Sequence, residues 1–274
     1  MPAASNPLHV SPWPVVAALS GRELRRFFRQ RNRVVGALGQ PLIFWLLFSA
    51  GLGPSFRLPG VGDSQISFAQ FFLPGTAVLI VLFTSIFATI SVIEDRREGF
   101  LQSVLVAPIP RWSMVLGKLL GGTLIALVQA LLFLALGMFV GVHVSLLGWL
   151  GIAVLLFVLA LALTGLGFVI AWQLDSTQGF HAIMSVFLLP MWLLSGAFFP
   201  PAGGILAWIS RVNPLSYGVA ALRHLLYWSD PNASAHLDRL PSLAVCLAVT
   251  VLFAIVAFAA SWRVSARRTS GDLL

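Results

Sequence analysis

The chain has 274 residues, of which 58% are apolar and only 9% are charged, and its mean hydropathy is +0.93. A soluble domain is nearer half apolar and a quarter charged, so the composition excludes an ordinary soluble enzyme, and the high hydrophobicity excludes a disordered chain. We therefore expect an all-α integral membrane protein. The net charge of +8 would favour nucleic acid as the partner of a soluble protein, but in a membrane protein excess arginine reflects topology, so no nucleic-acid partner is expected.

The first predicted element is an amphipathic helix at about residues 22–35. One arc of this helix holds five basic residues, namely Arg22, Arg25, Arg26, Arg29 and Arg33. Leucine, phenylalanine and valine residues occupy the opposite side. Such a helix can lie in the membrane interface with its arginines on anionic lipid headgroups, or it can be a topology anchor without a partner.

Uncharged runs predict six membrane-spanning helices, since about 20 apolar residues cross the hydrocarbon core. Their approximate ranges are 35–53, 71–93, 119–142, 146–172, 182–199 and 243–262. Six spans place both termini on one side of the membrane. That side then holds six basic residues of the N-terminal segment, four of the loop between the second and third spans, and three of the tail. That side holds thirteen of the seventeen basic residues, which predicts cytoplasmic termini in a plasma membrane, the inner membrane of a bacterium.

The loop between the second and third spans, about 94–111, is predicted to form a short amphipathic helix near 94–107. The residues that define it are Glu94, Arg97, Glu98, Gly99, Phe100, Leu101, Val104, Leu105 and Pro108. The charged residues can pair at helical spacing, the apolar ones form a stripe, and proline ends the helix. The stripe can dock into a groove of a soluble partner, pack against the N-terminal helix, or lie on lipid.

The third span carries two further signals. The glycine pairs Gly117/Gly121 and Gly137/Gly141 permit close contact with another helix. Lys118 is expected to snorkel from the cytoplasmic edge of the span into water.

The segment between the fifth and sixth spans, about 200–228, is too apolar for a solvated loop and is predicted to be a helical hairpin that dips into the outer leaflet. Asn213 is expected to cap a helix that starts at Pro214. An apolar stripe follows on one face, formed by Leu215, Val219, Leu222 and Leu226. The hairpin can act as an extracellular gate, or as an interfacial anchor.

The sequence contains no recognisable catalytic constellation. Gly117-Lys118 lacks the earlier glycine and the following Ser or Thr of a phosphate-binding loop, and the five histidines have no ligand-like spacing, so neither a nucleotide site nor a metal site is expected. None of the predicted spans has an ionisable residue at its centre, where ion-coupled carriers usually need one. If the protein does work, we expect a partner to supply the energy.

In this order, the features resemble the permease subunits of ABC exporters of the ABC-2 type, which export drugs, lipo-oligosaccharides and polysaccharides. Three stretches carry the resemblance: Glu94-Asp-Arg-Arg-Glu98-Gly99 through Pro108, Arg111 and Gly117-Lys118; Leu194-Ser195-Gly196-Ala-Phe-Phe-Pro200; and Asn213-Pro214-Leu-Ser-Tyr217 through Arg223. The six-span plan and both loops extend the similarity over nearly the whole chain.

The resemblance implies a subunit without enzymatic activity that pairs with a second permease copy, identical or related, and with two copies of a separate ATPase. ATP and Mg would bind the ATPase, and this chain would hold no cofactor. The 94–107 helix would be the coupling helix, and the N-terminal helix would be the connecting helix. The hairpin would gate the exit, with Asn213, Pro214, Tyr217 and Arg223 as its marked residues.

The resemblance also implies export by alternating access. We expect a mostly apolar pathway for an amphiphilic or lipid-linked substrate, with Thr84, Thr89, Phe187 and Met191 as candidate lining residues. Membrane lipids would surround the spans. The alternatives are an ATP-independent membrane protein, such as a lipid scramblase or scaffold, and an ion-coupled carrier.

Overall fold

A computed structural model describes residues 11–53, 67–198, 204–228, 237 and 240–266 of the chain. Within these ranges every regular element is a helix, which confirms the all-α prediction for this part of the molecule. In chain order the elements are α1 (Pro12–Arg29), α2 (Arg31–Leu52), α3 (Phe68–Ala88), α4 (Ile90–Arg97), α5 (Phe100–Val106), α6 (Arg111–Ala135), the short 3-10 helix η2 (Leu136–Val140), α7 (Leu146–Gln173), α8 (Thr177–Leu193), α9 (Ile205–Val212), α10 (Pro214–Leu226) and α12 (Leu243–Ala266).

Four helical stretches are long and apolar enough to cross a membrane. They are Phe68–Arg97, which joins α3 and α4, Arg111–Val140, which joins α6 and η2, and the helices α7 and α12. The apolar part of α2 is shorter, Leu38–Leu52, and α8 has 17 residues. The chain is therefore a multi-pass membrane protein, and a total of six spans requires α2 and α8 to cross as well.

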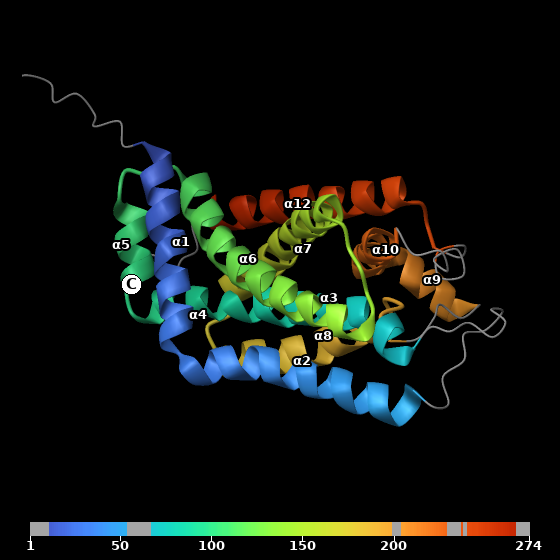
Figure 1. Cartoon of the computed structure of the whole chain (residues 1–274). Helices are drawn as coiled ribbons and strands as arrows, with labels where there is room; N and C mark the ends of the chain where they lie inside the picture. The colour runs from blue at the N-terminus through green and yellow to red at the C-terminus, as the bar shows by residue number, and fades with distance from the viewer. Residues whose placement is uncertain (1–10, 54–66, 199–203, 229–236, 238–239, 267–274) are drawn as a thin grey trace, which may run out of the picture.

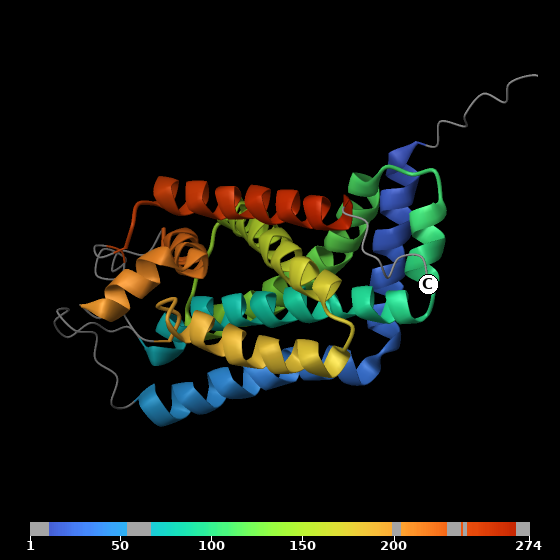
Figure 2. The same ribbon diagram turned by 180° about the vertical axis from the view of Figure 1, so that it is seen from behind.

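The long helices form a bundle around α3 (Figures 1 and 2). Helices α2, α6 and α7 pack on α3, and α12 packs on α7 and α10. In the most apolar part of the α3–α4 stretch, 83% of the residues are buried, whereas in that of α12 only 22% are buried. Helix α3 is therefore central and α12 is peripheral. Helix α1 lies across one end of the bundle next to α5, whereas α9 and α10 lie at the opposite end (Figure 1).

The N-terminal helix differs from its predicted range of 22–35 at both ends. It begins at Pro12 and ends at Arg29, and α2 starts at Arg31 after a break at Gln30. Proline residues occupy the first turn of α1, where a missing amide hydrogen costs nothing, so they start this helix instead of preventing it. The side chain of Arg33 lies outside the described residues.

The loop between the second and third spans forms two helices instead of one. Helix α4 continues the line of α3 and ends at Arg97, and α5 begins at Phe100. Between them, Gly99 has φ of +76°, a left-handed conformation that glycine adopts without steric cost. The chain therefore turns sharply at Gly99, and α5 lies beside α1.

At the opposite end of the bundle, the predicted cap is confirmed. The Asn213 side chain accepts a hydrogen bond from the Leu215 amide at 3.0 Å, and Pro214 is the first residue of α10. The predicted apolar stripe of α10 is buried. Residues 199–203, at the start of the predicted hairpin, lie outside the described residues.

Candidate functional site

Asp95 is the centre of a buried group of charged side chains where α1, α4 and α6 meet. Its carboxylate has no exposed surface. Arg22 donates two hydrogen bonds to it, at 2.9 and 2.8 Å, and Arg26 donates a third at 3.0 Å. Lys118 of α6 also donates to Asp95. Such two-pronged and charge-assisted bonds are the strong class of hydrogen bond.

Two further carboxylates complete this group, which we call the charge cluster: Arg22, Glu23, Arg26, Glu94, Asp95 and Lys118. Lys118 Nζ donates to Glu23 Oε1 at 2.5 Å, and Arg26 Nη2 donates to Glu94 Oε2 at 2.7 Å. The three cations are thus matched by three carboxylates, as burial requires, because a buried charge without a partner costs several kcal/mol.

Asp95 favours the charged form of Arg22. Burial alone would lower the pKa of Arg22, but the hydrogen bonds and the charge of Asp95 outweigh this effect and raise the pKa above its ordinary value. Arg22 therefore stays charged at every physiological pH, and it binds α1 to α4 as a permanent ion pair.

Two glycines of α6 let α1 approach closely enough to make these bonds. A Cβ atom at Gly117 would lie 2.9 Å from the Leu19 Cβ atom, and one at Gly121 would lie 2.5 Å from the Glu23 Cβ atom. Both distances are shorter than contacts between real side chains. The predicted close contact at this glycine pair is confirmed, and the neighbouring helix is α1.

The cluster corrects one expectation. Lys118 does not snorkel into water, because only 6% of its surface is exposed and it bonds to Glu23 and Asp95, which take the place of solvent. Arg22 and Arg26 bind carboxylates of the same chain but keep partly exposed side chains, whereas Arg25 and Arg29 are exposed.

The predicted apolar stripe of α5 faces the protein's own core. Leu101 is buried, and Phe100, Val104 and Leu105 pack against the core as partly buried residues. The Arg22 guanidinium lies 3.8 Å from the centre of the Phe100 ring, which adds a cation–π contact between α1 and α5. The opposite face of α5 is open, and Val106 is 84% exposed.

The other predicted coupling residues, Glu98, Pro108 and Arg97, lie in different surroundings. Glu98 is largely exposed, with Arg26 at 3.6 Å, and Pro108 is exposed beyond the end of α5. Arg97 turns the other way and donates to the Asp175 backbone oxygen at 3.0 Å. That bond connects the end of α4 to the turn between α7 and α8.

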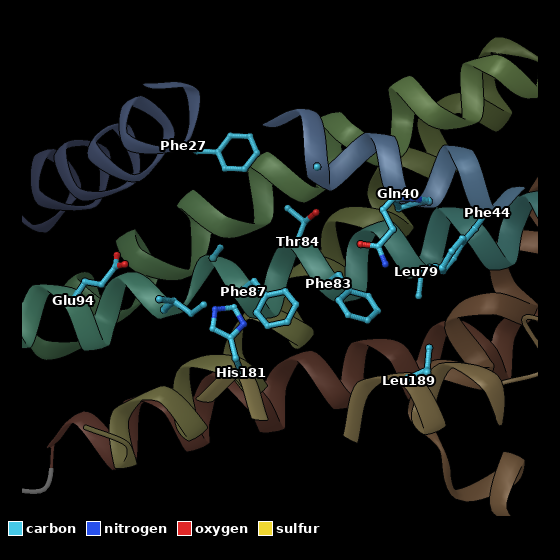
Figure 3. A pocket seen from close by; sticks show the side chains of 14 residues that line it. Phe27, Gln40, Phe44, Leu79, Phe83, Thr84, Phe87, Glu94, His181 and Leu189 are labelled. Carbon is cyan, nitrogen blue, oxygen red and sulfur yellow. The ribbon is translucent and has the colours of Figure 1, made fainter. Parts of the chain in front are cut away.

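A cavity of about 460 Å³ lies against the charge cluster, between α2, α3, α4 and α8. We call it the aromatic cavity, because phenylalanine side chains from three helices line it, with Gln40, Thr84 and His181 as polar neighbours (Figure 3). Glu94 lies at one end of the cavity, and Leu79 and Leu189 lie towards the other end (Figure 3). Its volume lies within the range that is usual for pockets that bind drug-sized molecules.

The structure brings one of the four candidate pathway residues into this cavity. Thr84 lines it, and the Thr84 hydroxyl donates to Gln129 at 2.6 Å. Thr89 is buried elsewhere and donates to the Ile86 backbone oxygen. Phe187 is 68% exposed on the outer face of α8, and Met191 is partly buried near the opposite end of the bundle.

The four candidate gate residues lie together at the α9–α10 end. Besides capping α10 from the position before Pro214, Asn213 donates to the Met191 backbone oxygen at 2.6 Å, and the Tyr217 hydroxyl donates to the Arg211 backbone oxygen at 2.8 Å. The buried Arg223 side chain donates to the backbone oxygen of Gly196 at 2.9 Å, and its guanidinium lies 4.4 Å from the centre of the Phe71 ring. These bonds tie α10 to α8 and to the turn that follows α8.

The described helices define a multi-pass membrane protein, with a cross-helix held by ion pairs at one end and two short helices at the other. The ABC-2 type transporter family matches residues 14–227, most of the chain. The chain belongs to this family.

Curated relatives agree with this assignment. The chain is 26% identical over 249 residues to a putative transport permease, ycf38, of Cyanophora paradoxa, covering 86% of this chain and 84% of the relative. It is 25% identical over 193 residues to the probable multidrug ABC transporter permease YbhR of Escherichia coli, covering 69% of this chain and about half (52%) of the relative. It is also 25% identical over 191 residues to the daunorubicin resistance ABC transporter permease protein DrrB1 of Streptomyces coeruleorubidus, covering 68% and 66%.

Proposed function

We propose that the chain is the membrane-spanning permease subunit of an ABC exporter. It works as a dimer with a second permease copy, and two copies of a separate subunit bind ATP and Mg and hydrolyse the ATP. Family membership and the names of the relatives support the permease role. The observation that carries the proposal is the charge cluster. It joins α1, which lies beside the proposed ATPase contact on α5, to α4 and α6, which would move.

In the proposed mechanism, the ATPase subunit first contacts the exposed face of α5. The ATPase contacts Ser103, Val106 and Pro108, which are exposed. Movement of α5 passes to α1 through the Arg22–Phe100 contact, and from α1 to the bundle through Asp95 and Lys118. A packed and ion-paired assembly transmits such displacements because it does not deform continuously.

In this mechanism, ATP binding draws the two ATPase subunits together, and the spans open alternately to the two sides of the membrane. The α1 end faces the cytoplasm, where thirteen of the seventeen basic residues are expected. Six spans, including α2 and α8, place both termini on that side. An amphiphilic substrate enters from the cytoplasmic side, and the α9–α10 hairpin lies above the exit.

The decisive test places a charge on the exposed face of α5. Val106→Asp is preferred to a charge at Leu101, because Leu101 is buried and its replacement would disturb folding as well as docking. The variant and the wild type are co-purified with the ATPase subunit, sought first in the neighbouring reading frame, and ATP hydrolysis is measured in vesicles. We expect Val106→Asp to weaken the association by about tenfold or more and to lower ATP hydrolysis stimulated by the permease.

The matched control is Val212→Asp, at an exposed valine of α9 on the opposite end of the bundle. This variant should keep the association with the ATPase subunit, because α9 lies at the opposite end of the bundle, and both variants should reach the membrane in wild-type amounts. Equal behaviour of the two variants, whether intact or impaired, would refute α5 as the contact. A permease that never stimulates any ATPase would refute the proposed function itself.

A further inference from the structure

An open hollow of about 660 Å³ lies along the last two turns of α1, beside the turn that joins α4 to α5. We call it the basic hollow. The described residues that line it are Arg22, Arg25, Arg26, Arg29, Gln30 and Glu98. The four arginines occupy positions i, i+3, i+4 and i+7 of one helix, so they lie on a single side of α1.

Two of these arginines already have counter-charges. Arg22 and Arg26 bond to carboxylates of the charge cluster, and Arg26 also lies 3.6 Å from Glu98. Arg25 and Arg29 are exposed, and among the described residues no carboxylate lies within ion-pair distance of either side chain. The unbalanced positive charge of the hollow is therefore that of Arg25 and Arg29.

The spacing of Arg25 and Arg29 favours a shared anion. They are four residues apart, so their side chains are neighbours on the helix, and like charges at this spacing destabilise a helix. The Nε atom of Arg25 donates to the Gly21 backbone oxygen at 3.2 Å, and its other guanidinium nitrogens have no partner in the described part of the chain. Guanidinium groups bind phosphate oxygens through paired hydrogen bonds. A phosphate between the two side chains would remove their repulsion.

The basic hollow lies at the level of lipid headgroups. Helix α1 lies across the end of the bundle, so it runs along the membrane surface (Figure 1). Helix α2 starts at Arg31, and Val35, which is 70% exposed, already belongs to its uncharged run. These two residues are about 6 Å apart along the helix axis, at roughly 1.5 Å per residue. One headgroup layer is about 5–8 Å thick, so Arg29 at the end of α1 lies within this layer.

Exposed aromatic side chains on α1 favour a lipid over an acidic protein partner. Phe28, which lies between the two arginines in sequence, is 60% exposed, and Trp13 in the first turn is 63% exposed. Aromatic and basic side chains together are typical of helices in the membrane interface, where rings reach the acyl chains and cations reach the headgroups. An acidic protein surface would pair with the arginines but would leave these rings in water.

From these observations we infer that the basic hollow binds the phosphate of an anionic phospholipid through Arg25 and Arg29. The acyl chains of this lipid pass into the bilayer beside the exposed start of α2. The inference goes beyond the proposed function, because it requires neither cargo nor an ATPase. It gives α1 a lipid partner next to the charge cluster, whose own charges are already balanced.

The experiment measures lipid binding to the purified permease, without an ATPase, by native mass spectrometry. The protein is titrated with phosphatidylglycerol and, separately, with phosphatidylcholine of the same acyl chains. Both lipids have a phosphate, but the choline cation cancels its charge and would be repelled by the arginines. We expect phosphatidylglycerol to bind about tenfold more tightly or more. Glycerol 3-phosphate, which has the phosphate but no acyl chains, should not displace it.

Single neutral variants locate the site. Arg25→Gln and Arg29→Gln should each weaken the binding of phosphatidylglycerol by about fivefold or more. Arg263→Gln is the matched control, because Arg263 is exposed in the last turn of α12, at the same end of the bundle but outside the hollow (Figure 2). In nanodiscs of phosphatidylcholine all three variants should unfold at the wild-type temperature, since none of these arginines belongs to the charge cluster.

The inference is overturned if the two lipids bind alike, or if the three variants bind phosphatidylglycerol alike. Displacement of the lipid by glycerol 3-phosphate at comparable concentrations would make the hollow a site for a free phosphate, and would also overturn it. So would unchanged lipid binding together with loss of ATPase association in Arg25→Gln and Arg29→Gln, which would assign the hollow to the ATPase. Because lipid binding is measured without an ATPase, its failure leaves the proposed function to its own test.

Discussion

Among the single residues, Asp95 is the one carboxylate of the charge cluster that accepts hydrogen bonds from all three of its cations. It accepts hydrogen bonds from Arg22, Arg26 and Lys118 and is completely buried. Glu23 and Glu94 each satisfy only one of these cations at hydrogen-bond distance. Removal of the Asp95 charge therefore leaves the cluster with an excess of positive charge, part of it on the buried Lys118.

The change Asp95→Asn tests this role. The amide keeps the shape of the carboxylate but not its charge, and loss of one partner from a buried ionic group costs about 3–5 kcal/mol. We expect a clear drop in the midpoint of thermal unfolding of the purified permease, measured by the fluorescence of its tryptophans.

Glu98→Gln serves as the control for Asp95→Asn, because the Glu98 side chain is 59% exposed and exposed ion pairs contribute at most about 1 kcal/mol. Its unfolding midpoint should stay close to that of the wild type. If both variants unfold together at the wild-type temperature, the cluster is not a structural support.

Most members of the cluster stand out in the sequence, but their pairing does not. Lys118 and Arg22 occur where the positive-inside bias places basic residues anyway, so their charges alone indicate topology and lipid contact. Their partners are far away in the sequence, at separations of 95 residues for Lys118 to Glu23 and 73 for Arg22 to Asp95. One signal in the sequence is Glu23, the only carboxylate between Arg22 and Arg33, which stands three residues before Arg26.

At the scale of helices, the contact between α1 and α6 depends on the absence of side chains at Gly117 and Gly121. The change Gly121→Ala would bring a Cβ atom to 2.5 Å from the Glu23 Cβ atom, so α1 would have to move outward and the Lys118–Glu23 bond would lengthen. Overpacking of this kind costs about 1–3 kcal/mol. We expect a lower thermal midpoint and faster proteolysis at the arginines of α1.

Gly39→Ala is the matched control for the helix contact. A Cβ atom at Gly39 in α2 would meet nothing within 4 Å, and alanine is the better helix former by up to about 1 kcal/mol. This variant should be as stable as the wild type or more so. A Gly121→Ala protein of unchanged stability would show that the close approach of α1 is not required.

The long helices could be predicted because apolar runs of sufficient length leave few alternatives in a membrane. Helix α7 illustrates this, since it lies at Leu146–Gln173 where 146–172 was predicted. The limits of the shorter helices depend on local backbone chemistry that hydropathy does not report. The early start of α1 at Pro12 and the turn at Gly99 are both of this kind.

At the scale of the whole molecule, the two ends of the bundle differ in chemistry. One end has α1, α5 and the charge cluster, and the other has the short helices α9 and α10 (Figure 2). No apolar side chain of α9 is buried, and Ile205 is 79% exposed. The proposed orientation places the first end in the cytoplasm and the second outside.

Orientation can be measured with single cysteines, because Cys246 is the sole cysteine of the chain and is buried. In a Cys246→Ala background, Ile205→Cys should react with a membrane-impermeant maleimide in intact cells. Arg25→Cys should react only after the cells are opened. The reverse pattern would invert the proposed topology, and labelling of both in intact cells would contradict placement at opposite ends.

The distance in sequence between the members of the charge cluster also sets an order of events during synthesis. Glu23 emerges from the ribosome 95 residues before Lys118, its partner. At roughly 5–20 residues per second, that interval lasts about 5–20 s. During this time α1 exists as a basic segment without its partner on α6, so its arginines are available to water and lipid headgroups, and the charge cluster is complete only when α6 has been made.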